Sequence, residues 1–191
     1  RKMASLLKDA GADLNCRDVE GRTPLIFSIS ENKKLSYIRW LISNGANVTL
    51  LSANTEFCGP QAGALHVAAS LGKIEETQMI ISAGADTNSR DGSGWTPLFY
   101  AVARSLPSNV DVVKTLIDGH ARVNITDSEG VTPLLLSVMQ KTEDCAHQLL
   151  HARADPNAFS SQHGSPIFQC VMRGLTNTLR QILAYGGVPD G

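Results

Sequence analysis

The stretch DSEGVTPL, residues 127–134, decides the fold of this chain, because the same eight-letter pattern recurs along the sequence. Gly130 supplies a backbone conformation that residues with a β-carbon resist, so a sharp turn is expected there. Thr132 is placed to accept hydrogen bonds from the free amides of a helix start, and Pro133 fits the first helical position. The apolar run that begins at Leu134 continues into a helix. The pattern therefore predicts a turn followed directly by a helix.

Copies of this pattern keep a nearly constant spacing. Clear copies stand at residues 18–25 (DVEGRTPL) and 91–98 (DGSGWTPL), and weaker ones at 63–66 (GALH) and 165–168 (SPIF). Successive starts lie 40, 33, 36 and 33 residues apart when these positions are taken as equivalent: Thr23, Gly63, Thr96, Thr132 and Ser165. A second apolar run follows each start. Each unit is therefore expected to hold a turn and two helices.

A second mark, the loop that ends each unit, repeats with the same period. It reads GADLN at residues 11–15 and GADTN at 84–88, with looser versions later in the chain. A period near 33 residues, with TPL, two helices and a GADxN loop, resembles the ankyrin repeat. The resemblance covers essentially the whole chain. It implies an all-α solenoid of stacked helix-turn-helix units with β-turn or hairpin fingers.

The repeat boundaries follow from the two marks. Residues 1–17 are expected to hold only the second helix and loop of a partial repeat. One domain, residues 1–191, is expected to contain that piece and five full repeats, at residues 18–51, 52–90, 91–126, 127–159 and 160–191. Stacked repeats need polar caps at their ends, and none is evident among Leu179, Ile182 and Leu183. The segment is therefore expected to be a monomeric piece of a longer protein.

Composition excludes several classes of partner. The formal net charge is −1 and the pI is near 6.6, so the broad basic surface of a phosphate-backbone binder is absent. No nucleic acid is expected as the main partner. The sequence has no apolar run of about eighteen residues and no apolar region of a secretory signal, so no direct membrane insertion is expected.

The cysteines point to a reducing compartment. They fall at most one to a repeat without a CxxC pair, which favours reduced thiols used as small core residues: Cys16, Cys58, Cys145 and Cys170. A cytoplasmic location, or a nuclear one, is the expectation.

The repeat at residues 52–90 departs most from the pattern. About six extra residues, 52–57, precede its start, and the usual Thr-Pro has become Gly63-Ala64. A longer finger is predicted, either as a tolerated surface insertion, since loop length costs little, or as a device that projects Phe57 as a contact. His66 matches the TPLH histidine of the ankyrin family, so the resemblance implies a structural hydrogen-bonding role. A metal role is disfavoured because no second ligand stands at a suitable spacing.

The residue that ends the second helix changes along the chain. Glycine is expected to adopt the left-handed cap in the earlier repeats, but His120 and Arg153 stand there later. A β-carbon in that conformation costs about 1–2 kcal/mol, unless Gly119 takes over by a one-residue shift. Arg153→Gly is therefore expected to raise the urea midpoint.

No catalytic constellation is evident, so the chain is not expected to be an enzyme or to hold a cofactor or metal. The nearest candidate is Cys145 with His147 and His151, the two histidines lying four residues apart on one helical face. Further ligands are lacking, and a solvated face is favoured.

The resemblance implies where a partner protein or peptide binds. In the ankyrin family the binding side chains are the letters between Asp and Gly, the letter before Thr-Pro and the pair that ends the first helix. Together with the inserted phenylalanine, the expected binding residues are Glu20, Arg22, Glu31, Phe57, Leu71, Ser93, Trp95, Arg104, Glu129, Val131, Met139, Gln140, Met172 and Arg173.

Trp95 and Arg104 are the strongest of these candidates. Aromatic and arginine side chains dominate binding hot spots, and a tryptophan at the apex of a turn has no obvious core to enter. Trp95→Ala is therefore expected to change stability by no more than about 1 kcal/mol while abolishing partner capture.

Two asparagines are candidates for modification. Leu7, Asp13, Leu14 and Asn15 resemble the pattern by which asparaginyl hydroxylase recognises ankyrin repeats, and the residues before Asn124 match it less fully. The alternative is a loop asparagine that satisfies the backbone.

The expected function is that of a protein–protein interaction module that binds through its concave face and finger tips. Two other functions stay open, a targeting arm of a larger enzyme, such as a ubiquitin ligase or kinase, and a structural tether for membrane or cytoskeletal proteins.

Overall fold

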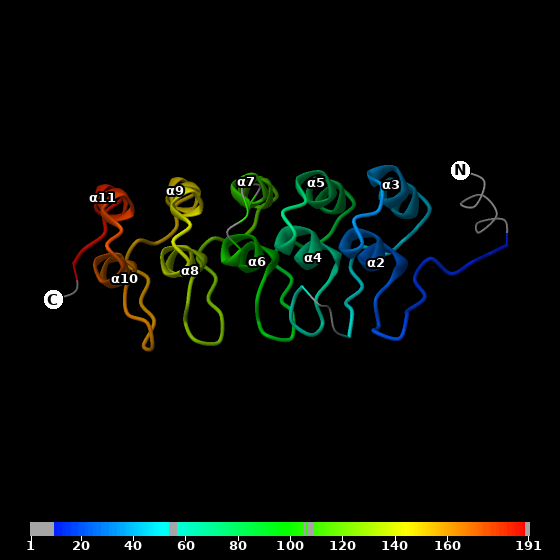
Figure 1. Cartoon of the computed structure of the whole chain (residues 1–191), viewed down its shortest axis with the longest axis horizontal. Helices are drawn as coiled ribbons and strands as arrows, with labels where there is room; N and C mark the ends of the chain where they lie inside the picture. The colour runs from blue at the N-terminus through cyan, green and yellow to red at the C-terminus, as the bar shows by residue number, and fades with distance from the viewer. Residues whose placement is uncertain (1–9, 54–56, 105, 107–108, 190–191) are drawn as a thin grey trace.

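The computed structural model describes residues 10–53, 57–104, 106 and 109–189, and every structural statement concerns these residues. They form a row of helical hairpins stacked side by side (Figure 1). The first helices of the hairpins lie in one row, the second helices lie in another, and the fingers project from the row of first helices (Figure 1). The expected all-α solenoid of helical hairpins is confirmed.

Each hairpin pairs a first helix with a longer second helix. The hairpins are α2 (Pro24–Ser30) with α3 (Leu35–Ser43), α4 (Ala64–Ser70) with α5 (Ile74–Ser82), α6 (Pro97–Ala103) with α7 (Asn109–Asp118), α8 (Pro133–Met139) with α9 (Glu143–His151), and α10 (Pro166–Arg173) with α11 (Thr176–Ala184). The second helix expected in the partial repeat falls mainly on residues 1–9, outside the described residues.

Caps at three of the first helices follow the predicted chemistry, whereas Thr96, the N-cap of α6, makes no side-chain cap hydrogen bond. The hydroxyls of Thr23, Thr132 and Ser165 accept hydrogen bonds from the backbone N–H three residues later, at 3.3, 3.2 and 3.1 Å. Such caps stabilise a helix by about 1 kcal/mol each. In α4 the N-cap is Gly63, and its own N–H donates to Nδ1 of His66 at 3.1 Å.

Left-handed residues end the second helices, as predicted. His120 has φ 66° and Arg153 has φ 65°, at the place where Gly45 and Gly84 have φ 97° and 90°. Gly119 does not adopt a positive φ, so no one-residue shift relieves these two residues. The strain expected from a β-carbon is therefore present at both.

The core is one continuous apolar cluster that runs through all the hairpins. Leucine or isoleucine occupies the second position of every first helix and is at most 6% exposed: Leu25, Leu65, Leu98, Leu134 and Ile167. Each such side chain stabilises the fold by about 1.5–3 kcal/mol relative to an exposed one. Because each hairpin buries its apolar surface against its neighbours, no hairpin has a separate core.

An asparagine ladder joins the loops that end successive repeats. The side-chain oxygen of Asn88 accepts from the N–H of Arg122 at 2.7 Å, and its amide donates to the carbonyl of His120 at 3.2 Å. The same two bonds to the next loop are made by Asn15, Asn124 and Asn157. In the first full repeat Thr49 holds this position, and both its N–H and its hydroxyl donate to Asn47 of its own loop, so the ladder is interrupted there.

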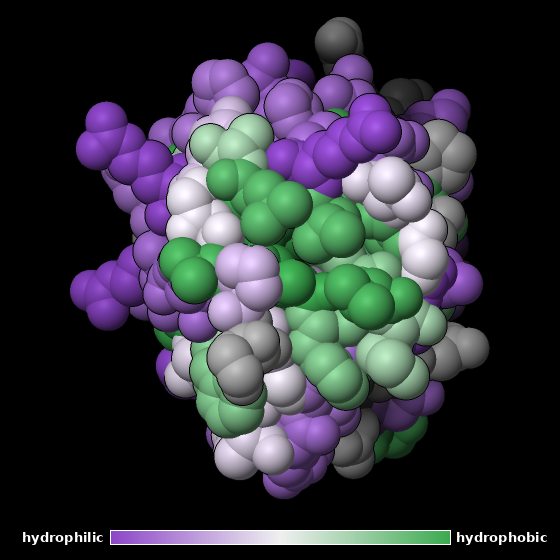
Figure 2. Space-filling view, turned by 90° about the vertical axis from the view of Figure 1, so that its left-hand side faces the viewer, coloured by the Kyte–Doolittle hydropathy of each residue, from purple (hydrophilic) through white to green (hydrophobic). Residues whose placement is uncertain are grey.

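The last hairpin presents an apolar face at the C-terminal end of the stack (Figure 2). Ile182 is fully buried, but Leu183 is 44% exposed and Leu179 is only partly buried. Apolar side chains therefore stand at this end, where a polar cap would be needed. Among the described residues, no helix has both the length and the apolar character needed to cross a membrane.

Candidate protein-interaction surface

The aspartate that opens each complete finger holds the finger together. The N–H of Asp91 donates to the carbonyl of Trp95 at 2.9 Å, and its carboxylate accepts from the N–H groups of Ser93 and Trp95 at 2.9 and 2.8 Å. Asp18 and Asp127 make the same set of bonds in their fingers. Sequence reasoning assigned roles to the glycine, threonine and proline of the motif and missed the aspartate, which its recurrence could have indicated.

Neighbouring fingers are tied to one another. Nη1 of Arg90 donates to the carbonyl of Gly94 in its own finger at 2.8 Å and to that of Thr126 in the next at 2.9 Å. Nη1 of Arg17 bridges Gly21 and Leu51 in the same way. Fingers fixed in this way present their tips without an ordering cost on binding.

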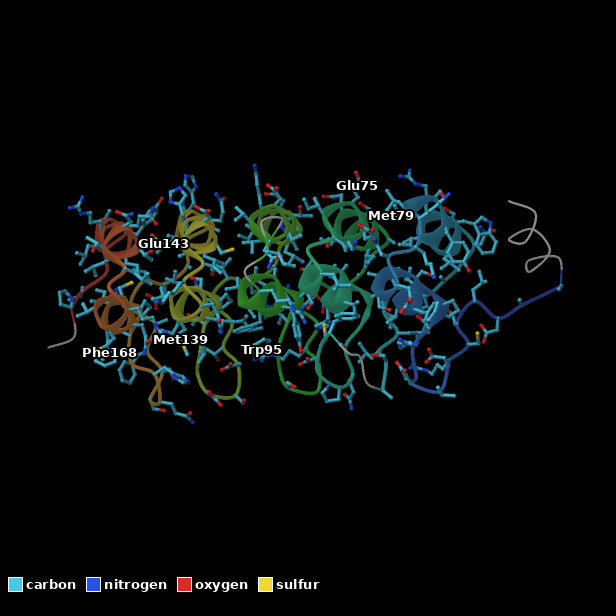
Figure 3. All side chains as sticks on the ribbon, in the orientation of Figure 1. Glu75, Met79, Trp95, Met139, Glu143 and Phe168 are labelled. Carbon is cyan, nitrogen blue, oxygen red and sulfur yellow. The ribbon has the colours of Figure 1, made fainter. Side chains whose placement is uncertain are left out.

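Trp95 does not stand free at its finger, so the argument that it has no core to enter is wrong. Its ring stacks on Phe99 with centroids 5.6 Å apart and contacts Tyr100 edge-on at 5.2 Å. Its Nε1 donates to the Asp127 carboxylate of the next repeat at 3.3 Å. Figure 3 shows Trp95 on the finger side of α6. The side chain is partly buried, so it presents only part of its ring to a partner.

Phe57 does not project as a free contact either. It is partly buried against the core, its carbonyl accepts from the Ser70 hydroxyl at 3.0 Å, and the Arg104 guanidinium lies 6.0 Å from its ring centroid. Arg104 itself is exposed and makes no ion pair among the described residues. Phe57 and Arg104, from different repeats, therefore form one aromatic–cation patch.

The long second finger is docked on the third one. The N–H of Gly59 donates to the Tyr100 hydroxyl at 2.6 Å, which donates to the buried Asp91 carboxylate at 2.5 Å. Gly92 donates to the carbonyl of Pro60 at 2.6 Å. Residues 54–56 of the predicted insertion lie outside the described residues. The segment on their C-terminal side is held by these hydrogen bonds to the third finger.

Val131 is buried, so the prediction that it binds a partner is wrong. It is 3% exposed, because its side chain enters the core at the base of its finger, so a partner has no access to it. Leu71 and Met139 are partly buried and pack against the core, with an edge left at the surface. Figure 3 shows Met139 beside α8.

The charged tips of two fingers are already paired. Arg22 contacts Asp18 at 2.8 Å and Glu20 at 3.0 Å, and its guanidinium lies 5.0 Å from the centroid of Phe27. Nε2 of His163 lies 3.1 Å from the Glu129 carboxylate. Pairs at the protein surface, such as these partly exposed ones, are worth about 1 kcal/mol or less, so they can be exchanged for pairs with a partner.

The remaining predicted residues lie along the ends of the first helices or at finger tips. Glu31 and Gln140 are exposed C-caps of α2 and α8, and Ser93 is exposed at its finger. Met172 is 68% exposed, whereas Arg173 is partly buried and its Nε donates to Gln169 at 2.9 Å. The structure thus brings Glu31, Leu71, Arg104 and Gln140 to equivalent places in successive hairpins.

Sequence reasoning missed three exposed phenylalanines, one of which, Phe168 in the last hairpin, is 48% exposed. Phe159 is 66% exposed in the last finger, and Phe27 is 37% exposed between Arg22 and Lys33. Phe159 stands just before the first residue of its finger, where other repeats have the polar residues Arg90 and Thr126. An aromatic residue at this position could have indicated an exposed contact. Phe27 carried no such signal, since it stands in the apolar run of its helix.

Both asparagines proposed for modification belong to the ladder. Asn15 accepts from the N–H of Asn47 at 2.7 Å, and Asn124 accepts from that of Asp155 at 2.7 Å. Each amide therefore satisfies the backbone of the next loop, as the alternative interpretation expects. Whether either is hydroxylated stays a prediction.

The titratable groups point to structural roles. His66 is fully buried, and burial lowers the pKa of its imidazole, whose Nε2 lies 3.0 Å from the carbonyl of Ser89. Burial also raises the pKa of the Cys145 and Cys170 thiols to about 11, so both stay protonated at neutral pH. Among the described residues, no group of three or more His, Cys, Asp or Glu side chains could hold a metal ion.

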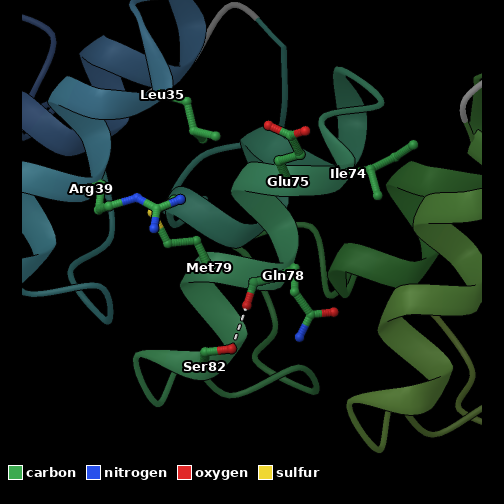
Figure 4. A pocket seen from close by; sticks show the side chains of 7 residues that line it. All are labelled: Leu35, Arg39, Ile74, Glu75, Gln78, Met79 and Ser82. Atoms are coloured by element: carbon green, nitrogen blue, oxygen red, sulfur yellow. Dashed lines mark hydrogen bonds between the residues drawn. The ribbon is translucent and has the colours of Figure 1, made fainter.

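A pocket of about 580 Å³ lies between the second helices α3 and α5, on the side opposite the fingers (Figure 4). Its walls carry apolar Leu35, Ile74 and Met79, with Arg39 and Glu75 as the charged groups. The Ser82 hydroxyl donates a hydrogen bond to the carbonyl of Gln78 at 2.8 Å. This lining lacks the supported nucleophile or acid–base pair that catalysis requires.

Stacked hairpins with regular fingers define a solenoid repeat protein. Comparison with known proteins then gives the family. A model of three ankyrin repeats matches residues 65–160, and a single ankyrin repeat model matches residues 20–53. The chain belongs to the ankyrin-repeat family, whose repeats are generally protein–protein interaction modules.

Individual relatives agree with this membership. The chain is 30% identical over 168 residues to human neurogenic locus notch homolog protein 2, covering 80% of this chain and 6% of the relative. It is 33% identical over 158 residues to the neurogenic locus Notch protein of Drosophila melanogaster, covering 75% and 6%. An ankyrin repeat protein of fowlpox virus is 31% identical over 130 residues, 65% of this chain and 36% of that protein.

Proposed function

We propose that this chain binds a partner protein or peptide across its concave face, along the finger tips and the ends of the first helices. The observation that carries the proposal is the Phe57–Arg104 patch at the C-terminal end of α6, with Trp95 at the finger before the other end of the same helix. It places an aromatic ring, an exposed guanidinium without an ion pair among the described residues, and part of an indole on adjacent hairpins. Such side chains supply the central contacts of many interfaces.

The donors of the Arg104 guanidinium fit a partner segment that offers a carboxylate or carbonyl group. A pocket of about 390 Å³ beside Arg104 is also lined by Lys141 and by the two carboxylates Glu143 and Asp144. The Arg104 guanidinium lies 6.0 Å from the Phe57 ring centroid and has no ion pair among the described residues, so its donors suit a bidentate bond. A carboxylate or a row of backbone carbonyls from the partner fits these donors.

Capture from a cell extract tests the proposal. We expect Arg104→Ala to lose the captured partner, with a fall in affinity of at least about tenfold for a hot-spot arginine. Arg39→Ala, an equal change of charge on the second helix α3, is the matched control and should keep the partner. Equal capture by wild type and the Arg104 variant would place the binding surface elsewhere.

We also propose Asn15 as a substrate for an asparaginyl hydroxylase, on the sequence resemblance alone. Intact-mass measurement after incubation with the enzyme should show one added oxygen, and Asn15→Gln should remove it. Wild-type protein with unchanged mass would end the idea.

A further inference from the structure

The C-terminal end face of the stack carries apolar side chains that a soluble surface does not explain. Phe168, Val171 and Met172, the third, sixth and seventh residues of α10, are 48%, 63% and 68% exposed. Figure 2 shows this end of the molecule, where hydrophobic side chains gather into one patch. A contiguous patch of this kind marks an interaction site.

The third and sixth positions are buried in every described hairpin that has a successor. The third and sixth residues of the other first helices are at most 1% exposed: Ile26 and Ile29, His66 and Ala69, Phe99 and Val102, Leu135 and Val138. The second and fifth residues of α10, Ile167 and Cys170, are 6% and 1% exposed although no described hairpin follows. The third and sixth positions are therefore the ones that a following hairpin covers.

The second helix of the last hairpin repeats this contrast. Ala146 and Leu150 of α9 are fully buried, whereas their equivalents in α11, Leu179 and Leu183, are partly buried and 44% exposed. On the preceding hairpin, α8 and α9, these positions are covered by α10 and α11. On α10 and α11 themselves the same positions are uncovered. The uncovered area continues the stacking interface in register.

The backbone also leaves the last hairpin as it leaves the others. Asn157 bonds to the carbonyl of Gly186 at 3.1 Å and to the N–H of Val188 at 2.8 Å, so the ladder reaches the final loop. Gly186 has φ 91°, close to Gly84 at 90°. In the internal repeats a loop of this form leads directly into the next finger.

We propose that this end face is covered by a further ankyrin-type helical hairpin, stacked in the same register as the others. Its first helix should carry leucine or isoleucine at the second position and a small residue at the fifth. Those are the buried choices throughout this chain, with the small residues being Ser28, Ala68, Ala101, Ser137 and Cys170. Charged residues at those two positions would be incompatible with the interface.

Appending one repeat to the chain tests the proposal. A copy of residues 126–159 fused after Gly191 keeps the repeat register and carries Leu134 and Ser137 at the two required positions. We expect the extended protein to unfold in one transition, with Tm higher by at least about 4 °C. Amide hydrogen exchange in α10 and α11 should slow by at least tenfold. A separate unfolding transition for the appended repeat would overturn the proposal.

A double variant separates docking from general effects on folding. Phe168→Glu with Val171→Glu should shift the Tm of the 191-residue chain by less than about 2 °C, because both side chains are already exposed. In the extended protein it should remove the whole gain in Tm and in exchange protection. An equal effect in both proteins would contradict the proposal. So would a dimer of the 191-residue chain, seen by light scattering, that the double variant dissociates, since a second copy would then be the occupant.

Discussion

Nε1 of Trp95 donates a hydrogen bond across the repeat boundary to the Asp127 carboxylate, 3.3 Å away. The ring also stacks on Phe99, so this side chain links two repeats as well as facing the binding surface. The stability change of at most about 1 kcal/mol expected for Trp95→Ala from the sequence is therefore too small. We expect a loss of about 2–3 kcal/mol, below the value for a fully buried aromatic residue.

Trp95→Phe separates these two roles. It keeps a ring against Phe99 and removes the bond to Asp127, so we expect a loss of only about 1 kcal/mol in the free energy of unfolding. Urea titration of the wild type, Trp95→Phe and Trp95→Ala gives the three values. Equal losses for the two variants would mean that the hydrogen bond, rather than the stacked ring, carries the stability of this side chain.

Arg153→Gly should raise the urea midpoint, with a gain of about 1 kcal/mol, because Arg153 has φ 65° and glycine adopts that conformation without strain. His120→Gly, at φ 66°, should behave alike. Gly84→Ala is the matched reverse change. Gly84 has φ 90°, and a β-carbon added there would meet no atom within 4 Å, so only backbone strain should lower the stability of the variant. A higher midpoint for Gly84→Ala would contradict the strain argument.

Thr49→Asn should stabilise the junction between the first two full repeats. An asparagine there can complete the ladder with bonds to the loop at residues 84–86, and a pocket of about 50 Å³ lined by Thr49, Gly63 and Asp86 adjoins the position. Two added bonds are worth about 1–2 kcal/mol of unfolding free energy. Asn88→Thr, which creates the same gap one repeat later, should lose a similar amount. Thermal denaturation of both variants checks the pair, and loss of stability in Thr49→Asn would refute the account.

Stability should fall as the pH drops below about 6.5, the ordinary pKa of histidine. Burial lowers the pKa of His66 in the folded state, so below pH 6.5 the unfolded chain binds a proton that the folded chain does not. The free energy of unfolding should fall by at most about 1.4 kcal/mol per pH unit, and this fall should continue down to the pKa of His66 in the folded state. Denaturant midpoints between pH 7.5 and 5.5 measure it. His66→Gln should be less stable at pH 7.5 and show a shallower decline.

The repeat period could be found from the sequence because its signals are local. Thr132 caps a helix and Gly130 turns the chain through their own backbone, so each copy of the motif shows where a hairpin begins. The strained His120 and Arg153 were located in the same way. Placement of the candidate surface was less complete. Trp95 and Val131 stand at the same letter of the motif, yet Trp95 is partly buried and Val131 is 3% exposed.

The sequence by itself determined the helical hairpins, their order and the residues that start and end them, since these depend on contacts within one repeat. Only the tertiary structure decided which variable side chains remain free. Phe57 lies against Arg104, Tyr100 holds Gly59, and Thr49 leaves a gap in the asparagine ladder. Each of these relationships joins residues from different repeats or depends on how adjacent loops meet, and their geometry is fixed only when the hairpins stack.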